Sequence, residues 1–533
     1  MWWLAFTACT PSIGPSTDGG EPPLPEDSDR PSDTDPTGDT DASPTDTGDT
    51  GTALPDPCAI DAAMAVLSTT VAQPWKENEA EITVTLASPG TVAVVCTAAF
   101  DATEIHLVES TVEGTDHVLR LPGLLAGQTY DCAAAPTCPE MAASPTAFSF
   151  ATADAPSFIP NIHTTTYVGT PTGYALLNHS DDCTWNDQRL LVTDRDGQVR
   201  WYHETPAFVG PSIEFRYHGD DLFVWGGGWG PNALGRPRRI DLYDGEIYDS
   251  ADAIPDVNGS AFHHDGKQLP DGRMLTLEEV DVDTGGGTFQ GFRVRRVDPV
   301  TNTVDFDYHS QRGFDEGHLP AGFGDAWHAN WADIVDDGNG EVLYVSLCNL
   351  GWTLAIDVAT GDFLWVFGAG GDFSLVNAAG APLDGSEFPQ CQHGIESSGA
   401  NLLVYDNGNF GRGYTRVAEY ALDRAAMEAT LLWTWSEPDW WESTLGDADW
   451  MDNGHVWIGA GHADCFSSNP GDHTTVLEID PLTGDKVWEL QYAAVQAMAY
   501  RADHADGCAL FSMTRECPDL AARLVELEPI FAR

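Results

Sequence analysis

A short segment recurs six times along the chain, and it constrains the fold more than any other feature. Each copy has an aspartate, a turn that usually holds a glycine, and an apolar or aromatic run, as in IDPLTGDKVWEL around Asp480. Asp and Gly favour tight hairpin turns, while Val, Ile and Trp favour the flanking strands. The spacing of 47 to 66 residues suits one four-stranded sheet per copy, so six copies predict a six-bladed β-propeller. The six aspartates are Asp194, Asp241, Asp298, Asp357, Asp423 and Asp480.

Helical signals are weak, and the chain is predicted to be all-β. The one segment that favours an exposed helix is RAAMEATLL, residues 424–432, for which an elaborated hairpin is the alternative. With 533 residues, 42% of them hydrophobic, the chain can bury large cores and should contain more than one domain.

Residues 58–152 are predicted to form a small β-sandwich ahead of the propeller, which takes residues 153–533. EAEITVTLAS alternates apolar and polar residues, TVAVVCTAAF follows after a Pro-Gly turn, and FSFATADAP closes the segment. The stretch LPGLLAGQTYDC resembles a strand-turn-strand of fibronectin type III domains. We expect this domain to serve as a spacer or partial lid, since it offers no cluster of catalytic residue types.

The N-terminal segments predict export. Residues 1–9, MWWLAFTAC, form a short apolar run ending at Cys9, which resembles the end of a bacterial lipoprotein signal whose cysteine is lipidated. The run is short, contains no Lys or Arg and has Phe6 where Leu is usual, so an odd N-terminus on a cytosolic protein is the alternative. Residues 10–57 are rich in Asp, Thr, Pro, Ser and Gly and are predicted to be a disordered tether. We expect a cell-envelope protein that meets the membrane only through a lipid at Cys9.

Cysteine usage agrees with an oxidising compartment. Cys9 aside, four cysteines precede the propeller and six lie within it, and both even numbers suit disulfides. Cys508 and Cys517 are close enough in sequence to pair locally, while the other pairings stay open.

The charge excludes one class of partner. The formal net charge is -59, with only three lysines, Lys76, Lys267 and Lys486. Phosphate backbones require a basic surface, so nucleic acid is excluded as a partner. The acidic exterior favours solubility over a dedicated acidic binding face.

Histidines mark the candidate site. They occur in three strand-like segments: FHHDGKQLPDGRMLTLEE with His263 and His264, WHANWADI with His328, and QCQHGIESSGANLLVYDNG with His393. An imidazole can act as base, nucleophile or ligand near neutral pH. Because each segment has a comparable place within the repeat, the three predict one pocket shared by several blades. The alternatives are a packed turn residue for His263 or His264 and a satisfied core histidine for His328.

These motifs, in this order, resemble the bacterial arylsulfate sulfotransferase family and its arylsulfotransferase-like branch. The resemblance covers roughly residues 160–500 and rests on HHD with LPDGRMLTLEE, His-x-Asn, TGDFLWVFG, Gln-His, and YDNG with TRVAEY. It implies a six-bladed propeller behind a β-sandwich. It also implies transfer of a sulfuryl group from a phenolic sulfate to a phenol through a sulfohistidine, without a nucleotide donor.

The resemblance assigns roles to particular residues. His393 would be the nucleophile, beside Gln392 in the substrate pocket. His328, Asn330 and one of His263 or His264 would hold the sulfuryl oxygens and assist proton movement. Strand alternation aims one of the adjacent histidines into the channel, and we favour His264.

One departure from the family concerns an arginine. The family's active enzymes have an arginine about eighteen residues after His-x-Asn, where this chain reads SLCNLGW, with Cys348 or Asn349 near that place. Neither offers the planar fork of donors that a guanidinium presents to sulfate. Arg412 or Arg416 could substitute, although Arg416 in TRVAEY is expected to be a structural blade residue.

Two other function classes stay open. Cys391-x-His393 and the segment His462-x-Asp464-Cys465 contain metal-ligand types, which would suit a metal-dependent hydrolase. Even cysteine counts favour disulfides instead, so we predict no metal and no cofactor. A propeller that binds ligand without catalysis is the second alternative, because fold does not determine function. Phenols and phenolic sulfates are the expected partners, and the oligomeric state is left open.

Overall fold

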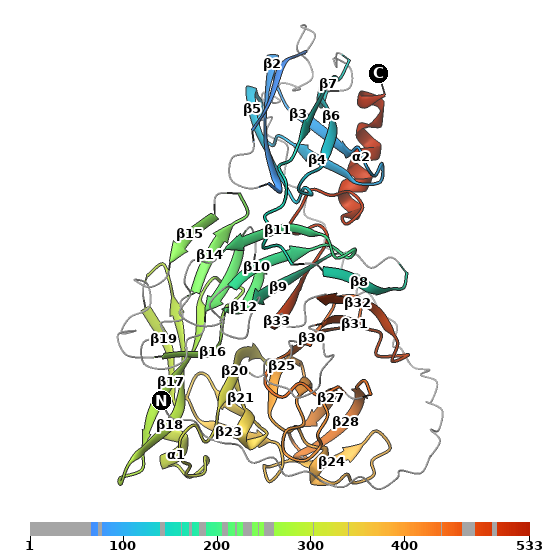
Figure 1. The fold of residues 1–533 in the computed structure, drawn as a ribbon. Helices are drawn as coiled ribbons and strands as arrows, with labels where there is room; N and C mark the ends of the chain where they lie inside the picture. The colour runs from blue at the N-terminus through green and yellow to red at the C-terminus, as the bar shows by residue number, and fades with distance from the viewer. Residues whose placement is uncertain are drawn as a thin grey trace, which may run out of the picture. The chain divides into compact units, whose positions relative to one another are not determined.

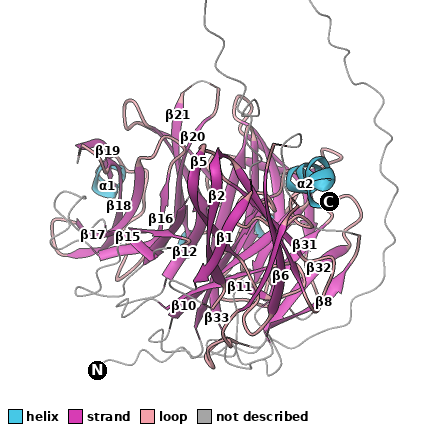
Figure 2. Ribbon diagram, turned by 90° about the horizontal axis from the view of Figure 1, so that it is seen from above, coloured by secondary structure: helices cyan, strands magenta, loops and turns pink. Residues whose placement is uncertain are grey.

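The computed structural model describes residues 65–532 apart from 73–76, 139–143, 161, 170–172, 181–187, 205–211, 219–220, 227–236, 244, 250–260, 302, 339, 439, 461–474 and 493–497. The predicted signal-like segment, the tether and Cys9 therefore lie outside the described residues, as do His462, Asp464 and Cys465. Strands dominate the described chain (Figures 1 and 2). None of its helices has both the length and the apolar character that a membrane crossing requires.

Six sheets of the described residues form the six blades of a propeller, each a meander of antiparallel strands. From the inner strand outward, the first three blades are β33 (Met498–Ala505), β9 (Tyr174–Ser180), β10 (Gln188–Thr193) and β11 (Val199–Glu204); β12 (Ser212–His218), β13 (Asp221–Gly226), β14 (Pro237–Asp241) and β15 (Gly245–Asp249); and β16 (Ala261–Gln268), β17 (Met274–Asp283), β18 (Thr288–Asp298) and β19 (Thr303–His309).

The remaining three blades follow the same plan, with one extra strand in each of the last two. They are β20 (Ala329–Asp336), β21 (Glu341–Leu347), β22 (Trp352–Asp357) and β23 (Phe363–Phe367); β25 (Gln392–Ser398), β26 (Asn401–Asp406), β27 (Arg416–Asp423), β28 (Glu428–Trp435) and the parallel edge strand β24 (Ser374–Asn377); and β29 (Asp447–Trp450), β30 (Val456–Ala460), β31 (Thr475–Ile479), β32 (Lys486–Tyr492) and β8 (Ile162–Tyr167).

The predicted repeat is the turn between the third and fourth strands of every blade. In each copy the aspartate carboxylate accepts a hydrogen bond from a backbone N–H two or three residues later, as Asp480 does from Leu482 N at 2.8 Å. This local bond makes an Asx turn without help from the rest of the fold. The corresponding bonds run from Asp196 N to Asp194, Tyr243 N to Asp241, Val300 N to Asp298, Thr360 N to Asp357 and Ala425 N to Asp423. The six-bladed prediction is confirmed.

Both ends of the propeller segment close the ring. β33, near the C-terminus, pairs with β9 as the inner strand of the first blade, and β8, which precedes β9, pairs with β32 as the outer strand of the sixth. Figure 1 shows β33, in red, beside the green β9. The closure brings residues near position 500 against inner strands from the middle of the chain.

Large aromatic side chains fill the space between blades. Trp327 packs with Phe292 and Leu343 between the third and fourth blades, and Trp331 packs with Tyr344 and other apolar residues between the fourth and fifth. Trp327 and Trp331 are nearly fully buried. Each large apolar side chain that is buried contributes about 2 kcal/mol to stability, so these layers hold neighbouring blades together.

Two sheets packed on one apolar core precede the propeller, as predicted for the β-sandwich. The core includes Ile82, Val94, Leu121 and Tyr130. The fibronectin type III resemblance stays a prediction. The sheets are β1 (Val66–Ala72), β2 (Glu79–Gly90) and β5 (Gly114–Pro122), and β4 (Ile105–Glu109), β3 (Val92–Ala98), β6 (Thr129–Pro136) and β7 (Thr146–Ala151).

Helices are few among the described residues. α1 (Ser310–Asp315) follows β19, and two short 3-10 turns, η2 (Cys348–Leu350) and η3 (Gly385–Glu387), lie between strands. After β33 the chain returns to the sandwich, where α2 (Pro518–Phe531) buries Leu527 and Ile530 against Ala93 and Ala135.

The helix predicted at residues 424–432 is wrong, and the hairpin alternative is what forms. Asp423 accepts backbone hydrogen bonds from Ala425 N and Ala426 N, which makes a turn, and β28 starts at Glu428. Pairing of β28 with β27 outweighs the helix propensity of alanine and methionine.

A buried ion-pair network joins the propeller to the sandwich. The Arg200 guanidinium of the first blade donates to both carboxylate oxygens of Glu104, at 2.8 and 3.0 Å, and to Asp194 at 2.7 Å. All three side chains are at most 1% exposed. Water therefore cannot replace any partner that is lost.

We expect Arg200→Met to lower the free energy of unfolding by about 3 kcal/mol, because it leaves Glu104 buried without its guanidinium partner and leaves Asp194 with Arg515 as its remaining cation. Chemical denaturation measures this loss. Arg120→Met is the matched control, since Arg120 lies 3.9 Å from Glu81 at 38% exposure and should contribute less than about 1 kcal/mol. Equal effects of the two substitutions would contradict the structural role of Arg200.

Candidate active site

Three histidines from successive blades lie together at the inner strands. His264 is in β16, His328 immediately precedes β20, and His393 is in β25. The ring centroids of His264 and His328 are 4.5 Å apart, and those of His328 and His393 are 6.4 Å apart. His264 and His393 are buried, while the His328 side chain is 17% exposed. The side chain of His263 lies outside the described residues.

His393 is held as a neutral imidazole of one tautomer. Asn407 donates through Nδ2 to the backbone carbonyls of Glu442 and Leu445, at 2.7 and 2.9 Å, so its Oδ1 faces the ring. That oxygen lies 2.9 Å from Nδ1 of His393 and accepts its proton, which leaves the lone pair on Nε2. Burial, together with the electrostatic influence of the neighbouring His328 and Arg501, lowers the pKa of His393 to about 3.

His328 is oriented by a carboxylate. Its Nδ1 bonds the Asp325 side chain, and its backbone N–H donates to the same carboxylate at 3.0 Å. The backbone of His328 is left-handed, with φ of 49°, a conformation that costs energy for a residue with a Cβ. A carboxylate on Nδ1 holds the ring so that Nε2 is the proton-accepting nitrogen, as in other carboxylate–histidine pairs.

Asn349 holds the backbone of Asp325. Its Nδ2 donates to the backbone carbonyl of Asp325 at 2.7 Å. The predicted substrate-binding residue therefore has a contact that positions Asp325 and, through it, His328.

Asn330 and Gln392 each bond the backbone of a neighbouring blade. Asn330 Nδ2 donates to the backbone carbonyl of Gln392 at 2.8 Å, and Gln392 Nε2 donates to that of Trp352 at 2.8 Å. Both side chains are fully buried. Asn330 thus fixes the start of β25, the strand that carries His393.

Arg501 of β33, which the sequence analysis did not identify, bonds the backbone of His393. Its guanidinium contacts the inner strands of four other blades and is 4% exposed. It donates to Asp265 Oδ1 at 3.0 Å, to the Asn330 carbonyl at 3.0 Å and to the His393 carbonyl at 3.1 Å, and it lies 3.7 Å from an Asp447 oxygen. Arg501 therefore binds the backbone carbonyls of Asn330 and His393.

Arg412 and Arg416, the predicted substitutes for the family's arginine, are engaged within the fifth blade. Arg416 bonds Asp406, Glu387 and the Tyr420 hydroxyl, as expected for a structural blade residue. Arg412 bonds the same Asp406 and the backbone carbonyls of Ser386 and Phe388. These contacts use the donor groups that a sulfate would need.

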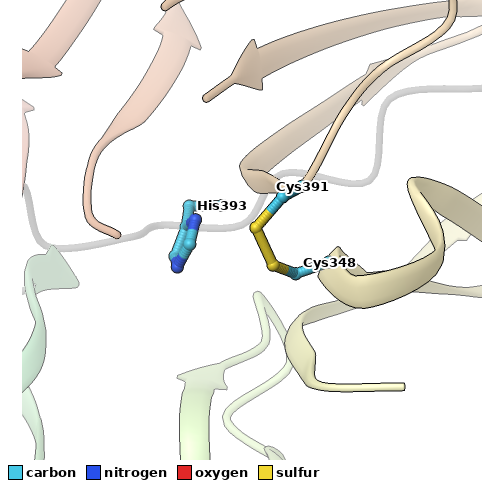
Figure 3. A group of neighbouring side chains, drawn as sticks. All are labelled: Cys348, Cys391 and His393. Atoms are coloured by element: carbon cyan, nitrogen blue, oxygen red, sulfur yellow. A yellow bond between two sulfur atoms is a disulfide. The ribbon is translucent and has the colours of Figure 1, made fainter. Parts of the chain in front are cut away.

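Cys348 and Cys391 form a disulfide beside His393 (Figure 3). It joins η2, after β21, to the residue that precedes β25. Cys391 has φ of 63°, so a second strained residue lies next to the site. In this oxidised form the sulfurs offer no thiolates to a metal. Cys508 and Cys517 also pair, which confirms the predicted local bridge, and Cys96 pairs with Cys132.

Three positioning residues escaped the sequence analysis. Asp325 lies three residues before His328 in GDAWH, and Asn407 lies in YDNG; both are near motifs already singled out. A carboxylate or amide close to a candidate histidine was the available signal. Arg501, in AYRADHAD, carried no such signal.

Comparison with known proteins identifies the family of this chain. The family model described as Arylsulfotransferase (ASST) matches residues 161–501. No curated protein matches the sequence.

Solved structures similar to this chain include a putative 6-phosphogluconolactonase from Bacteroides fragilis, with 11% identity, TM-score 0.33 and coverage of 78% of this chain and 98% of that one. TolB from Acinetobacter baumannii has 10% identity, TM-score 0.36 and coverage of 72% and 81%. A periplasmic gluconolactonase from Pseudomonas aeruginosa has 12% identity, TM-score 0.33 and coverage of 78% and 99%. Likenesses at this level carry no argument about function. The family match, in contrast, spans more than half of the sequence, and this protein belongs to the arylsulfotransferase family.

Proposed function

We propose that this protein transfers a sulfuryl group from a phenolic sulfate ester to a phenol through a covalent intermediate on His393. The proposal rests mainly on the protonation of the His393 imidazole. Its Nδ1 donates to Asn407, and burial lowers its pKa to about 3. Nε2 therefore keeps its lone pair at neutral pH. A nucleophile that needs no prior deprotonation suits attack on sulfur. Family membership supports sulfotransferase chemistry and phenolic small-molecule substrates in general.

The reaction proceeds in two balanced steps. In the first, the Nε2 lone pair forms a bond to sulfur, the bond between sulfur and the aryl oxygen breaks, and the donor leaves as a phenolate that takes up a proton. In the second, the acceptor phenol gives up its proton, its oxygen attacks sulfur, and the N–S bond breaks. We assign this proton movement to His328, because Asp325 bonds its Nδ1 and leaves Nε2 to accept and return a proton.

A chromogenic assay tests the proposal. The full chain is incubated with 4-nitrophenyl sulfate, with and without phenol, and with and without a chelator. Acceptor-dependent release of 4-nitrophenol that survives chelation, with a sulfuryl adduct on the peptide containing His393 when acceptor is omitted, is the expected result. Release without acceptor that chelation abolishes would assign the metal-dependent hydrolase instead.

The pH dependence of the first step is distinctive. With 4-nitrophenyl sulfate, whose leaving group needs little protonation, the first-turnover burst should stay level across about pH 5 to 8, where an ordinary histidine titrates. The lowered pKa means that His393 becomes protonated, and loses its lone pair, only as the pH falls toward about 3. Rapid-mixing absorbance measures the burst. A burst rate that halves near about pH 6.5 would show that the nucleophile titrates normally.

A non-catalytic binding propeller is favoured by one observation. Arg412 and Arg416 form their hydrogen bonds within the fifth blade. Cys348, near the expected place of the family's arginine, lies in a disulfide. That reading predicts binding of an aryl sulfate without turnover or adduct. Calorimetry beside the assay above separates the two.

We also propose that the protein is exported and lipid-anchored at Cys9. Three disulfides among the described cysteines support an oxidising compartment. Expressed with its native N-terminus, the protein should fractionate with membranes, and Cys9→Ser should release it. If the Cys9→Ser variant remained with the membranes, the proposed lipid anchor at Cys9 would be contradicted.

A further inference from the structure

We propose that the Cys348–Cys391 disulfide conceals a zinc site whose third ligand is His393. Reduction by a dithiol exposes the site, and zinc binding then takes His393 out of the reaction. The metal site itself is independent of the proposed function, whereas its effect on transfer rests on that function.

The three ligand atoms are already gathered. One sulfur from each of Cys348 and Cys391 and one imidazole nitrogen of His393 all lie within 4.8 Å of one another. Each of the three residues is 3% exposed. In a tetrahedral zinc site with Zn–S bonds of about 2.3 Å, neighbouring sulfurs are about 3.8 Å apart, so the two bonded sulfurs must separate by about 2 Å after reduction.

Both cysteine ligands lie outside the strands of the blades. Cys348 begins the three-residue turn η2 after β21, and Cys391 lies immediately before β25 (Figure 3). Neither sulfur is on the central part of a strand. Separation of the sulfurs after reduction therefore involves the turn η2 and the residue before β25 rather than the interior of a strand.

The surroundings of His393 suit a metal ligand. Histidines that bind zinc through one nitrogen usually donate the other N–H to an oxygen, which fixes the tautomer. Here Nδ1 donates to Asn407 Oδ1, and two backbone carbonyls fix that amide. Because Nδ1 is engaged with Asn407, the proposed site uses Nε2, the same atom that would attack sulfur.

The redox step balances with a dithiol as reductant. The S–S bond breaks, the two sulfurs receive two electrons and two protons, and the dithiol becomes a cyclic disulfide. Zinc then displaces the two thiol protons, and the Nε2 lone pair enters a Zn–N bond. Two thiolates and one imidazole select a soft ion such as zinc over magnesium or calcium. The disulfide therefore keeps the nucleophile available where thiols stay oxidised.

Cobalt, a spectroscopic substitute for zinc, tests the site without any activity measurement. The full chain is reduced anaerobically with dithiothreitol, freed of reductant and titrated with Co²⁺, beside a Cys348→Ser/Cys391→Ser variant treated identically. The wild type should bind one equivalent more than the variant, with a thiolate-to-cobalt charge-transfer band that zinc abolishes. Cys508→Ser/Cys517→Ser is the matched control, because it removes another disulfide and should keep the extra equivalent.

Two further measurements keep the outcome decisive if the serine variant folds poorly. In the reduced wild type, zinc should protect Cys348 and Cys391 from alkylation, as mapped by mass spectrometry, while Cys96 and Cys132 react as fast as without zinc. His393→Ala should weaken cobalt binding at least tenfold. Equal cobalt binding by wild type and serine variant, or no zinc protection, would overturn the site. If cobalt binds as expected but no transferase activity exists, the site stands and the proposed function fails.

Discussion

His393→Ala is expected to abolish acceptor-dependent release of 4-nitrophenol, with a loss in kcat of about 10³-fold or more, the scale seen when an enzyme's nucleophile is removed. Alanine leaves no atom that can take the sulfuryl group, so neither half of the two-step transfer can occur. The fold should persist, because Asn407 keeps its bonds to the carbonyls of Glu442 and Leu445. Steady-state rates with 4-nitrophenyl sulfate and phenol measure the loss.

His318→Ala is the control for removing an imidazole. His318 is 42% exposed and stacks on Phe363, away from the three rings of the site, so its loss should leave kcat within about twofold. Asn407→Leu should fall between these variants, since it keeps the nucleophile but releases its tautomer. A His393→Ala protein with more than a tenth of wild-type activity would refute the sulfohistidine.

Arg501→Met should have the largest effect on stability, lowering the free energy of unfolding by about 3–5 kcal/mol. The substitution leaves the buried carboxylates of Asp265 and Asp447 without this cation and takes a donor from the carbonyls of Asn330 and His393. Activity should fall as well, chiefly in kcat, because the backbone that aims His393 loses its support. Chemical denaturation and steady-state kinetics measure the two effects.

Arg293→Met is the matched control. Arg293 also pairs with an aspartate, Asp307, but at 27% and 42% exposure, so its loss should cost less than about 1 kcal/mol. Arg501→Lys should recover only part of the stability, because an ammonium cannot span the same acceptors as a guanidinium. If Arg501→Met were as stable as Arg293→Met, Arg501 would not hold the inner strands together.

Local interactions explain what was predictable. The Asx turn at Asp480 and its five counterparts depends on residues two or three positions apart, so sequence pattern alone reveals it. Segments whose state depends on partners were predicted less well. Residues 424–432 have the composition of a helix but pair with β27, and α2 was missed although Pro518 starts it and Leu520, Leu524 and Leu527 follow a helical period.

The sequence by itself determined the blades, their number and the histidine segments, because these follow from turn chemistry and side-chain alternation over a few residues. The tertiary structure alone decided which side chains contact the histidine segments. Closure of the ring brings Arg501 against strands that lie more than a hundred residues away in sequence. Packing of the fourth blade against the fifth sets Cys348 against Cys391 beside His393. The partners of a buried charge or a sulfur are chosen by which strands meet at the centre, and no local pattern encodes that meeting.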